Sequence, residues 1–295
     1  MRDSSSARVL HHLKRMCDLV STRIQEEGRR DLGLKVDGYQ PSTRLVDRIA
    51  EDTIVGYVKE NDLPLNILSE ELGYFDRGAD RTLVVDPVDG THNAIRSIPL
   101  YATSLAVGTK NLLDVEVGLV SNLATGVTYW AERGKGAFRD GVPLRTRPLP
   151  QSGRMFLAYV GRHSRDETDS LLRLSTRARS LGCASLEMCL VAEGHADAYI
   201  VLSPPEQHGM KVWDIAASYL LLREAGGGAV KGSDGSTRLD APLKAESAMD
   251  LIAFGDAALL KEVQRSFAKH APPDAGKHRK AAAPRSARPK KKGIR

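Results

Sequence analysis

Residues 83–93 read L-V-V-D-P-V-D-G-T-H-N, and the rest of the chain is best interpreted outward from this stretch. An apolar run ends at Asp86, and a second aspartate, Asp89, follows after Pro87 and Val88. A strand that ends at Asp86 brings its side chain to the carboxyl edge of a sheet, where α/β folds bind ligands. Pro87 has no N–H to add to a ladder and is expected to end that strand.

The same stretch predicts a cation site next to an anion site. Asp86 and Asp89 disfavour each other's charge at short range unless a cation lies between them. Gly90 lets the backbone approach a ligand, and Thr91 is expected to begin a helix whose N–H groups bind phosphate. Oxygen ligands favour Mg²⁺ or Mn²⁺ over zinc. The alternative interpretation is an ordinary turn rich in Asp, Pro and Gly.

Further carboxylates occur at the ends of two other predicted elements. Glu70 and Glu71 follow the apolar run I-L-S, and Asp214 opens the apolar helix W-D-I-A-A-S-Y-L-L-L. Taken singly, the glutamates are more typical of a solvated turn and Asp214 of a helix N-cap. Their occurrence together with Asp86 and Asp89, each at an element end, predicts one shared cation site.

Composition and length indicate a globular chain. It has 295 residues, 41% of them hydrophobic, which is enough for a sizeable core. No uninterrupted apolar run approaches the roughly 20 residues of a transmembrane helix, and the N-terminus lacks a signal-peptide pattern, so a cytoplasmic protein without a membrane partner is expected. Cys17, Cys183 and Cys189 form no C-x-x-C pair, which favours buried, reduced thiols.

The net charge of +6 is concentrated at one end. Residues 269–295 hold ten of the 43 Lys and Arg residues and one of the 37 acids, so the rest has a net charge of −3. The body therefore offers no electrostatic reason to expect a nucleic-acid face. The tail has no apolar periodicity and is expected to be disordered.

Secondary-structure patterns divide the chain into two halves. A first helix is expected over residues 8–27, and a second helix is expected to be capped by Ser42 or Thr43. Strand signals dominate residues 98–138. After a turn-rich stretch, 147–154, helices and strands alternate, which favours an α/β fold of stacked layers. The expected parts are an N-terminal α+β metal-binding half (1–150), a C-terminal α/β half that completes the site (151–268) and a disordered basic tail (269–295).

An ordered set of motifs resembles the inositol monophosphatase family. The motifs are S-E-E at 69–71, D-P-V-D-G-T-H-N at 86–93, G-K-G-A-F-R-D-G-V-P-L at 134–144, A-S-L-E-M-C-L-V-A-E-G-H-A-D-A-Y at 184–199 and W-D-I-A-A-S at 213–218. Together they cover roughly residues 8–255. Residues 36–52 are most similar to the archaeal-type fructose-1,6-bisphosphatase/inositol-1-monophosphatase branch.

The resemblance implies a layered αβαβα sandwich of the sugar phosphatase type, and a homodimer. It implies Mg²⁺-dependent hydrolysis of phosphate monoesters in carbohydrate metabolism, with fructose 1,6-bisphosphate and inositol 1-phosphate as expected substrates. A metal-activated water would attack phosphorus directly, and no covalent intermediate is required.

The resemblance also implies roles for single residues. One Mg²⁺ is expected on Glu70, Asp86 and the carbonyl of Val88, a second on Asp86, Asp89 and Asp214, and a weaker third on Glu70 with waters, helped by Asp37. Mn²⁺ is an alternative metal. Thr91 is expected to orient the attacking water, and the N–H groups of Gly90 and Thr91 to bind phosphate.

Two positions depart from animal-type members of the family. Val201 falls where those enzymes have a glutamate that recognises the inositol ring, so strict inositol specificity is not expected. Thr43 falls where those enzymes have an aspartate beside the catalytic threonine, so Asp37, in a turn-rich loop, is expected to take over part of that work. The catalytic set implied by the resemblance is therefore Thr91, Glu70, Asp86 and Asp37.

Substrate contacts are expected from a different loop. Gly182, Cys183 and Ala184 match the loop of the family that contacts the sugar. Arg177 and Arg179 come just before this loop and Lys211 just before the third motif, and one of these cations is expected to meet a distal phosphate. The alternative, that all three are plain surface cations, stays equally open.

Three other functions remain open on the sequence. A haloacid dehalogenase phosphatase needs aspartates spaced by one residue and leaves Glu70 and Asp214 without roles. A 3′-phosphonucleotide phosphatase would keep the same fold and metals. A nucleic-acid or acidic-partner binding protein would use the basic tail, but the tail has no aromatic residue for base stacking, so only weak, salt-sensitive contacts with nucleic acid are expected.

Overall fold

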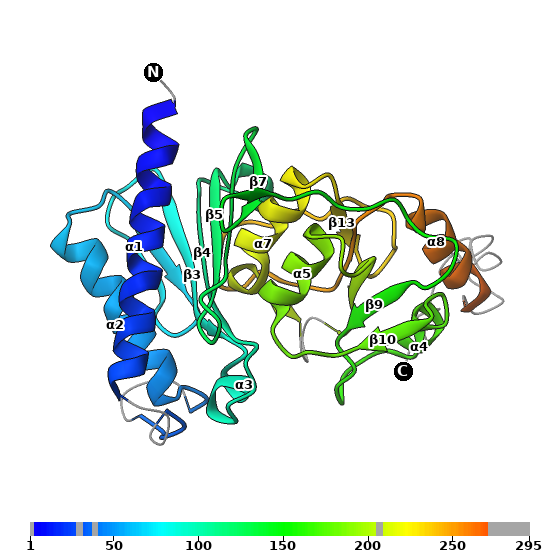
Figure 1. The fold of residues 1–295 in the computed structure, drawn as a ribbon, viewed down its shortest axis with the longest axis horizontal. Coiled ribbons are helices and arrows are strands. Elements are labelled where there is room, and N and C mark those ends of the chain that lie inside the picture. The colour runs from blue at the N-terminus through cyan, green and yellow to red at the C-terminus, as the bar shows by residue number, and fades with distance from the viewer. Residues whose placement is uncertain (1–2, 28–31, 37–40, 205–208, 271–295) are drawn as a thin grey trace, which may run out of the picture.

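The computed structural model describes residues 3–27, 32–36, 41–204 and 209–270, and Figure 1 shows them in five stacked layers. Two helices cover an eight-stranded sheet, two further helices fill the space between this sheet and a five-stranded sheet, and two more close the far side. The expected αβαβα sandwich is therefore confirmed. Asp37 and residues 271–295 lie outside the described residues.

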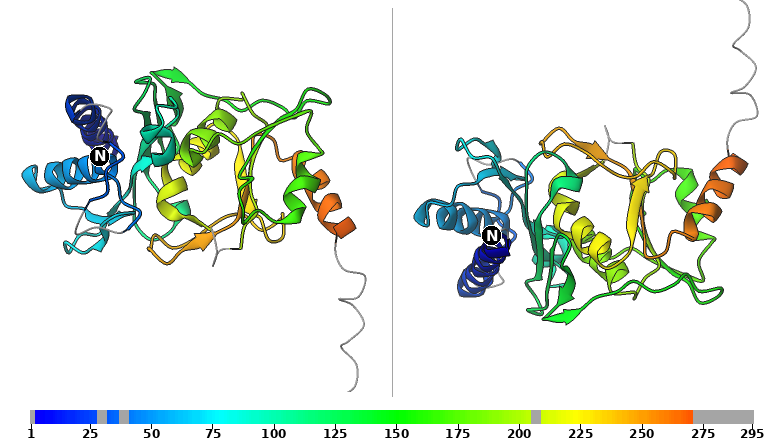
Figure 2. Two further views of the ribbon diagram at one scale, coloured as in Figure 1. Left: turned by 90° about the horizontal axis from the view of Figure 1, so that it is seen from below. Right: turned by 90° about the horizontal axis from the view of Figure 1, so that it is seen from above.

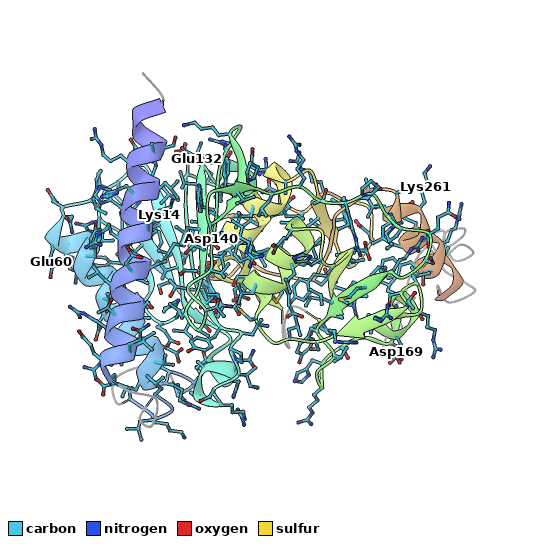
Figure 3. The ribbon with its side chains drawn as sticks, in the orientation of Figure 1. Lys14, Glu60, Glu132, Asp140, Asp169 and Lys261 are labelled. Atoms are coloured by element: carbon cyan, nitrogen blue, oxygen red, sulfur yellow. The ribbon has the colours of Figure 1, made fainter. Side chains whose placement is uncertain are left out.

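The first layer consists of α1 (Asp3–Glu27) and α2 (Leu45–Glu60), which pack on each other and on the large sheet. Apolar side chains at helical spacing, such as Leu13 and Val20, are fully buried at this contact. Lys14 lies over the ring of Trp130 at 3.6 Å, and Figure 3 labels it on the sheet-facing helix α1.

The eight-stranded sheet has the order β2-β1-β3-β4-β5-β6-β7-β8. Its strands are β1 (Asn66–Ser69), β2 (Gly73–Phe75), β3 (Thr82–Asp89), β4 (Ala102–Gly108), β5 (Val117–Asn122), β6 (Thr128–Glu132), β7 (Gly136–Arg139) and β8 (Val142–Pro143). β1 and β3 run parallel, and the remaining neighbours are antiparallel. The parallel pair carries three of the predicted carboxylates, Glu70, Asp86 and Asp89, toward its carboxyl edge.

The middle layer consists of α5 (Ala184–Ala192) and α7 (Val212–Glu224), which Figure 2 shows enclosed between the two sheets. Both helices are buried on nearly all sides, as expected for helices without a polar face. Gly118 of β5 permits this packing, because a Cβ there would lie 2.8 Å from the carbonyl oxygen of Ala217 on α7.

The five-stranded sheet has the order β10-β9-β11-β15-β13, with β10, β9 and β11 parallel. Its strands are β9 (Met155–Ala158), β10 (Arg177–Arg179), β11 (Ala198–Val201), β13 (Gly228–Lys231) and β15 (Leu251–Phe254), and the outer helices are α4 (Asp166–Leu172) and α8 (Leu259–His270). Shorter elements are α3 (Thr91–Ile95), η1 (Leu112–Asp114), β12 (Met210–Lys211) and β14 (Ala248–Met249). No helix in the described part of the chain combines the length and apolarity that a bilayer crossing needs.

Three expectations about local structure were wrong. Pro87 does not end its strand: β3 continues to Asp89 with an irregular register against β4 between Asp86 and Asp89. The N-cap of α2 is Arg44 rather than Ser42 or Thr43. Helix α8 ends at His270, so the first two residues of the predicted tail are helical.

Candidate metal and phosphate site

The predicted carboxylates come from the carboxyl ends of β1 and β3 and from the first turn of α7. Glu70 directly follows β1, and its N–H donates to the carbonyl of Val85 in β3 at 3.2 Å. Asp86 and Asp89 lie in the last part of β3, and Asp214 is the third residue of α7. The parallel pairing of β1 with β3 brings Glu70 beside the aspartates, because parallel strands end at the same edge.

Burial raises the pKa of all four carboxylates, and repulsion by neighbouring carboxylates adds to the rise for Glu70, Asp86 and Asp214. The pKa of Glu70 is raised well above its ordinary value, first by burial and then by the charges of Asp214, Glu71, Asp47 and Asp89. Asp86 has its pKa raised by burial, then by Glu70, Asp89 and Asp214. The side chains are thus close enough to disfavour each other's charge.

Asp86 gives the clearest sign that a cation is needed. It is 2% exposed, and its Oδ1 atom has no hydrogen-bond partner among the described residues. An unpaired buried carboxylate oxygen is costly unless a cation satisfies it. The donor set of carboxylates therefore fits a hard divalent cation such as Mg²⁺.

The carboxylates do not form a complete metal cage. In the part of the chain that the structure describes, no three His, Cys, Asp or Glu side chains are arranged to hold a metal ion. Two of the predicted ligands are directed toward helix starts: Asp89 toward α5, and Asp214 toward the first turn of its own helix. The predicted ligands are neighbours, and their ligand roles stay predictions.

Asp89 is held by the first turn of α5. Its Oδ2 accepts hydrogen bonds from the N–H of Ser185 at 2.6 Å, the hydroxyl of Ser185 at 2.5 Å and the thiol of Cys183 at 3.2 Å. Its Oδ1 accepts from the N–H of Ala184 at 3.2 Å. Burial raises the pKa of Asp89, and these donors oppose the rise because they stabilise the carboxylate.

Asp214 forms part of the N-terminal cap of α7. Its Oδ2 accepts from the N–H of Lys211, the N-cap residue, at 2.7 Å. Burial raises its pKa to about 7, while this hydrogen bond and the charge of Lys211 act in the opposite direction. Lys211 therefore lies beside the carboxylate cluster. It is one of the cations that the sequence analysis expected to meet a distal phosphate.

An aspartate that the sequence analysis did not single out lies beside Thr91. The hydroxyl of Thr91 lies 3.0 Å from Oδ1 of Asp47 and 3.0 Å from the carbonyl of Val88, so Asp47 is the aspartate beside it. Thr43 instead donates to Glu71. Burial is the main reason that the pKa of Asp47 rises to about 7, and the N–H of Arg44 holds the other carboxylate oxygen at 2.8 Å.

A further buried acid, Glu51, was also missed. It lies one turn after Asp47 on α2, accepts a hydrogen bond from Ser69, and is 3% exposed. Its pKa rises to about 7, chiefly through burial. A signal for both acids was present in the sequence, since Asp47 and Glu51 are spaced i, i+4 within the apolar stripe of α2.

The predicted substrate loop lies against Gly90. Gly90 has a φ of 86°, and a Cβ there would be 3.0 Å from the carbonyl oxygen of Leu100 and 3.1 Å from that of Gly182. Cys183 is 1% exposed and its thiol faces Asp89, so its side chain contacts a predicted metal ligand. Arg179 ends the edge strand β10, is exposed, and donates to the carbonyl of Ala178.

The chain is similar in sequence to curated archaeal phosphatases. The chain is 34% identical over 255 residues to a fructose-1,6-bisphosphatase/inositol-1-monophosphatase of Methanothermobacter thermautotrophicus, covering 81% of this chain and 89% of that protein. It is 31% identical over 248 residues to a fructose-1,6-bisphosphatase of Pyrococcus furiosus, covering 83% and 92%.

The fold leads to the same group of proteins. A solved inositol monophosphatase–fructose 1,6-bisphosphatase is similar with a TM-score of 0.76 and 28% identity, over 87% of this chain and 98% of that one. The model of the inositol monophosphatase family matches residues 7–265. On this match, which spans both sheets and all four carboxylates, the chain belongs to the inositol monophosphatase family.

Proposed function

We propose that this phosphoric monoester hydrolase removes phosphate from fructose 1,6-bisphosphate and inositol 1-phosphate. The observation that carries the proposal is the orphaned Oδ1 of buried Asp86 within a cluster of carboxylates, because such a cluster needs divalent cations. The names of the relatives point to the same substrates.

Members of this family are typically Mg²⁺-dependent, and two ions are proposed for this chain. Glu70, Asp86 and the carbonyl of Val88 would hold one ion, and Asp86, Asp89 and Asp214 the other. When bound, Mg²⁺ lowers the pKa of a water and neutralises charge on the phosphate. A weaker third ion on Glu70, helped by Asp37, and replacement by Mn²⁺ stay predictions.

Thr91 and Asp47 are proposed to orient and deprotonate the attacking water. When Asp47 is ionised, its Oδ1 accepts a hydrogen bond from the Thr91 hydroxyl at 3.0 Å, so the lone pairs of Thr91 can accept a hydrogen bond from water. With a pKa of about 7, Asp47 can take a proton near neutral pH. This pair is proposed for the role that the sequence analysis gave to Thr91, and the part expected of Asp37 stays a prediction.

Substrate choice is proposed to depend on the carboxyl edge of the second sheet. Arg179 ends β10 at the edge that the parallel strands β9 and β11 share, and Lys211 lies beside Asp214. A cation at this edge suits the second phosphate of a bisphosphate. Arg179→Ala is then expected to raise the KM for fructose 1,6-bisphosphate more than that for inositol 1-phosphate, while Arg173→Ala, an exposed cation at the end of α4, changes neither.

A substrate panel tests the function as a whole. Initial rates are measured with fructose 1,6-bisphosphate, inositol 1-phosphate and a 3′-phosphonucleotide, in Mg²⁺ and after chelation by EDTA. Mg²⁺-dependent release of phosphate from the first two supports the proposal, and Asp89→Asn should nearly abolish it. Exclusive hydrolysis of the nucleotide would replace the proposed substrates.

The homodimer and the cytoplasmic location stay predictions.

A further inference from the structure

Asn93 of α3 reaches from the first half of the chain to the loop that precedes α5. It lies two residues after Thr91 and is 9% exposed. Its Nδ2 donates to the carbonyls of Leu100 and Leu181, both at 2.8 Å, and lies 3.3 Å from that of Gly182. One short side chain thus fixes loop carbonyls that lie 88 and 89 positions further along the chain.

Glu187 of α5 holds the same loop from its N–H side. The N–H of Leu181 donates to Oε1 of Glu187 at 3.0 Å, and the N–H groups of Cys183 and Gly182 also interact with this carboxylate. Glu187 is 2% exposed, so its carboxylate, rather than solvent, is the acceptor for these loop N–H groups. The loop backbone is therefore gripped on its carbonyl side by Asn93 and on its N–H side by Glu187.

The gripped loop supports two parts of the proposed site. Its end is the start of α5, where Cys183, Ala184 and Ser185 supply the four hydrogen bonds to Asp89. Its Gly182 carbonyl occupies the space next to Gly90. A shift of this loop therefore moves the donors that orient Asp89 and changes the wall beside the predicted phosphate site.

We propose that Asn93 and Glu187 act as a two-sided clamp on residues 181–183 that orients Asp89 for metal binding. Both are positioning residues, because neither is placed against substrate or metal. The inference rests on the proposed function in that it assigns the metal to Asp89. Its test reads metal affinity directly, so it does not depend on which phosphate ester is hydrolysed.

The variants follow from the chemistry of each contact. Glu187→Gln keeps the shape but turns an amide NH₂ toward backbone N–H groups, and Asn93→Ala removes the donor to two carbonyls. Loss of a group that orients a metal ligand typically costs 10–100-fold in metal affinity or activity. If the two residues act as one clamp, the fold-loss of metal affinity in the double variant is much smaller than the product of the fold-losses in the two single variants.

A matched control is available in the same half of the chain. Asp197 is 3% exposed and, like Glu187, accepts a backbone N–H, that of Met155 at 2.8 Å, in addition to its ion pair with Arg147. It precedes β11, at the end of the strand opposite to Val201. Asp197→Asn should lower the melting temperature and leave metal affinity unchanged.

Mn²⁺ titration by calorimetry, on wild type and on each variant of the full chain, decides the question. The clamp predicts a 10–100-fold weaker Mn²⁺ affinity in Asn93→Ala and in Glu187→Gln, with wild-type affinity in Asp197→Asn. Wild-type Mn²⁺ affinity in both clamp variants, with only their melting temperatures lowered, overturns it. A wild type that binds Mn²⁺ but hydrolyses none of the sugar phosphates overturns the proposed substrates and leaves the clamp to be judged by affinity.

Discussion

The hydroxyl oxygen of Thr91 lies 3.0 Å from a carboxylate oxygen of Asp47, although the two residues are 44 positions apart in the chain. This contact joins helix α2 to the first residue of α3, the short helix that follows β3. It places a buried acid with a pKa of about 7 next to the residue expected to orient the attacking water. The contact makes α2 part of the proposed catalytic machinery.

Replacing the acid of this pair tests its role in proton transfer. Asp47→Asn keeps the size of the side chain and an acceptor for Thr91, but an amide cannot take a proton. General-base catalysis typically contributes about 10²–10⁴-fold, so kcat should fall by this order while KM changes little. Asp52→Asn, on the exposed face of the same helix, is the control. A kcat for Asp47→Asn within a few-fold of wild type would remove Asp47 from the mechanism.

Gly90 should tolerate no side chain. Alanine at a φ of 86° is strained by roughly 1–2 kcal/mol, and its Cβ would also press on the carbonyls of Leu100 and Gly182. Crowding of this kind adds about 1–3 kcal/mol, so Gly90→Ala should lower the free energy of unfolding by more than the strain alone. Gly78→Ala is the matched control, because its φ is 72° and nothing lies within 4 Å of its Cβ. Equal losses in urea melts of the two variants would contradict the close approach.

Glu51 should make the metal-free protein less stable as the pH rises. Its pKa rises from 4.5 to about 7 on folding, so the folded state binds more protons between these values and stability falls with increasing pH. A shift of this size lowers the free energy of unfolding by about 3 kcal/mol at pH 8, and it has little effect below pH 4.5.

Glu51→Gln imitates the protonated acid and isolates this effect from that of the other buried carboxylates. In EDTA, the stability of the variant relative to wild type should increase from pH 5 to pH 8. Thermal melts of both proteins at the two pH values measure it. A difference that stays constant across this range would show that Glu51 titrates at its ordinary value.

Asp86 should destabilise the metal-free protein and allow Mg²⁺ to stabilise it. In EDTA at pH 8, Asp86→Asn removes one of several repelling buried charges, so its melting temperature should exceed that of wild type. Added Mg²⁺ should stabilise wild type, by about 2.7 kcal/mol at a concentration of 100 Kd, and the variant far less. The exposed Asp80→Asn serves as control. An equal Mg²⁺ shift in all three proteins would place the ion elsewhere.

The sequence predicted those parts of the site that lie at element ends. Glu70, Asp86, Asp89 and Asp214 each follow or open an apolar segment. Their occurrence together in the chain, rather than any one local pattern, predicted a shared site. Asp47 was missed because its partner Thr91 is distant in the chain. The motif comparison instead matched Thr43, which donates to Glu71, to the family aspartate that lies beside the catalytic threonine.

The sequence could not show what fixes the carboxylates. The contacts of Asp89 with Ser185 and of Asn93 with Leu181 depend on how α5 docks against β3, which no local pattern records. Pro87 illustrates a different limit. Its missing N–H suggested a strand end, but an irregular register against β4 lets the strand continue.

The central claim is that the four carboxylates bind divalent cations together. Diffraction from crystals soaked in Mn²⁺, recorded to detect anomalous scattering, tests it most directly. The account predicts anomalous peaks next to the carboxylate oxygens of Glu70, Asp86, Asp89 and Asp214, with Asp89 still bonded to Ser185. The absence of a peak among these side chains, or peaks confined to other acids, would contradict it.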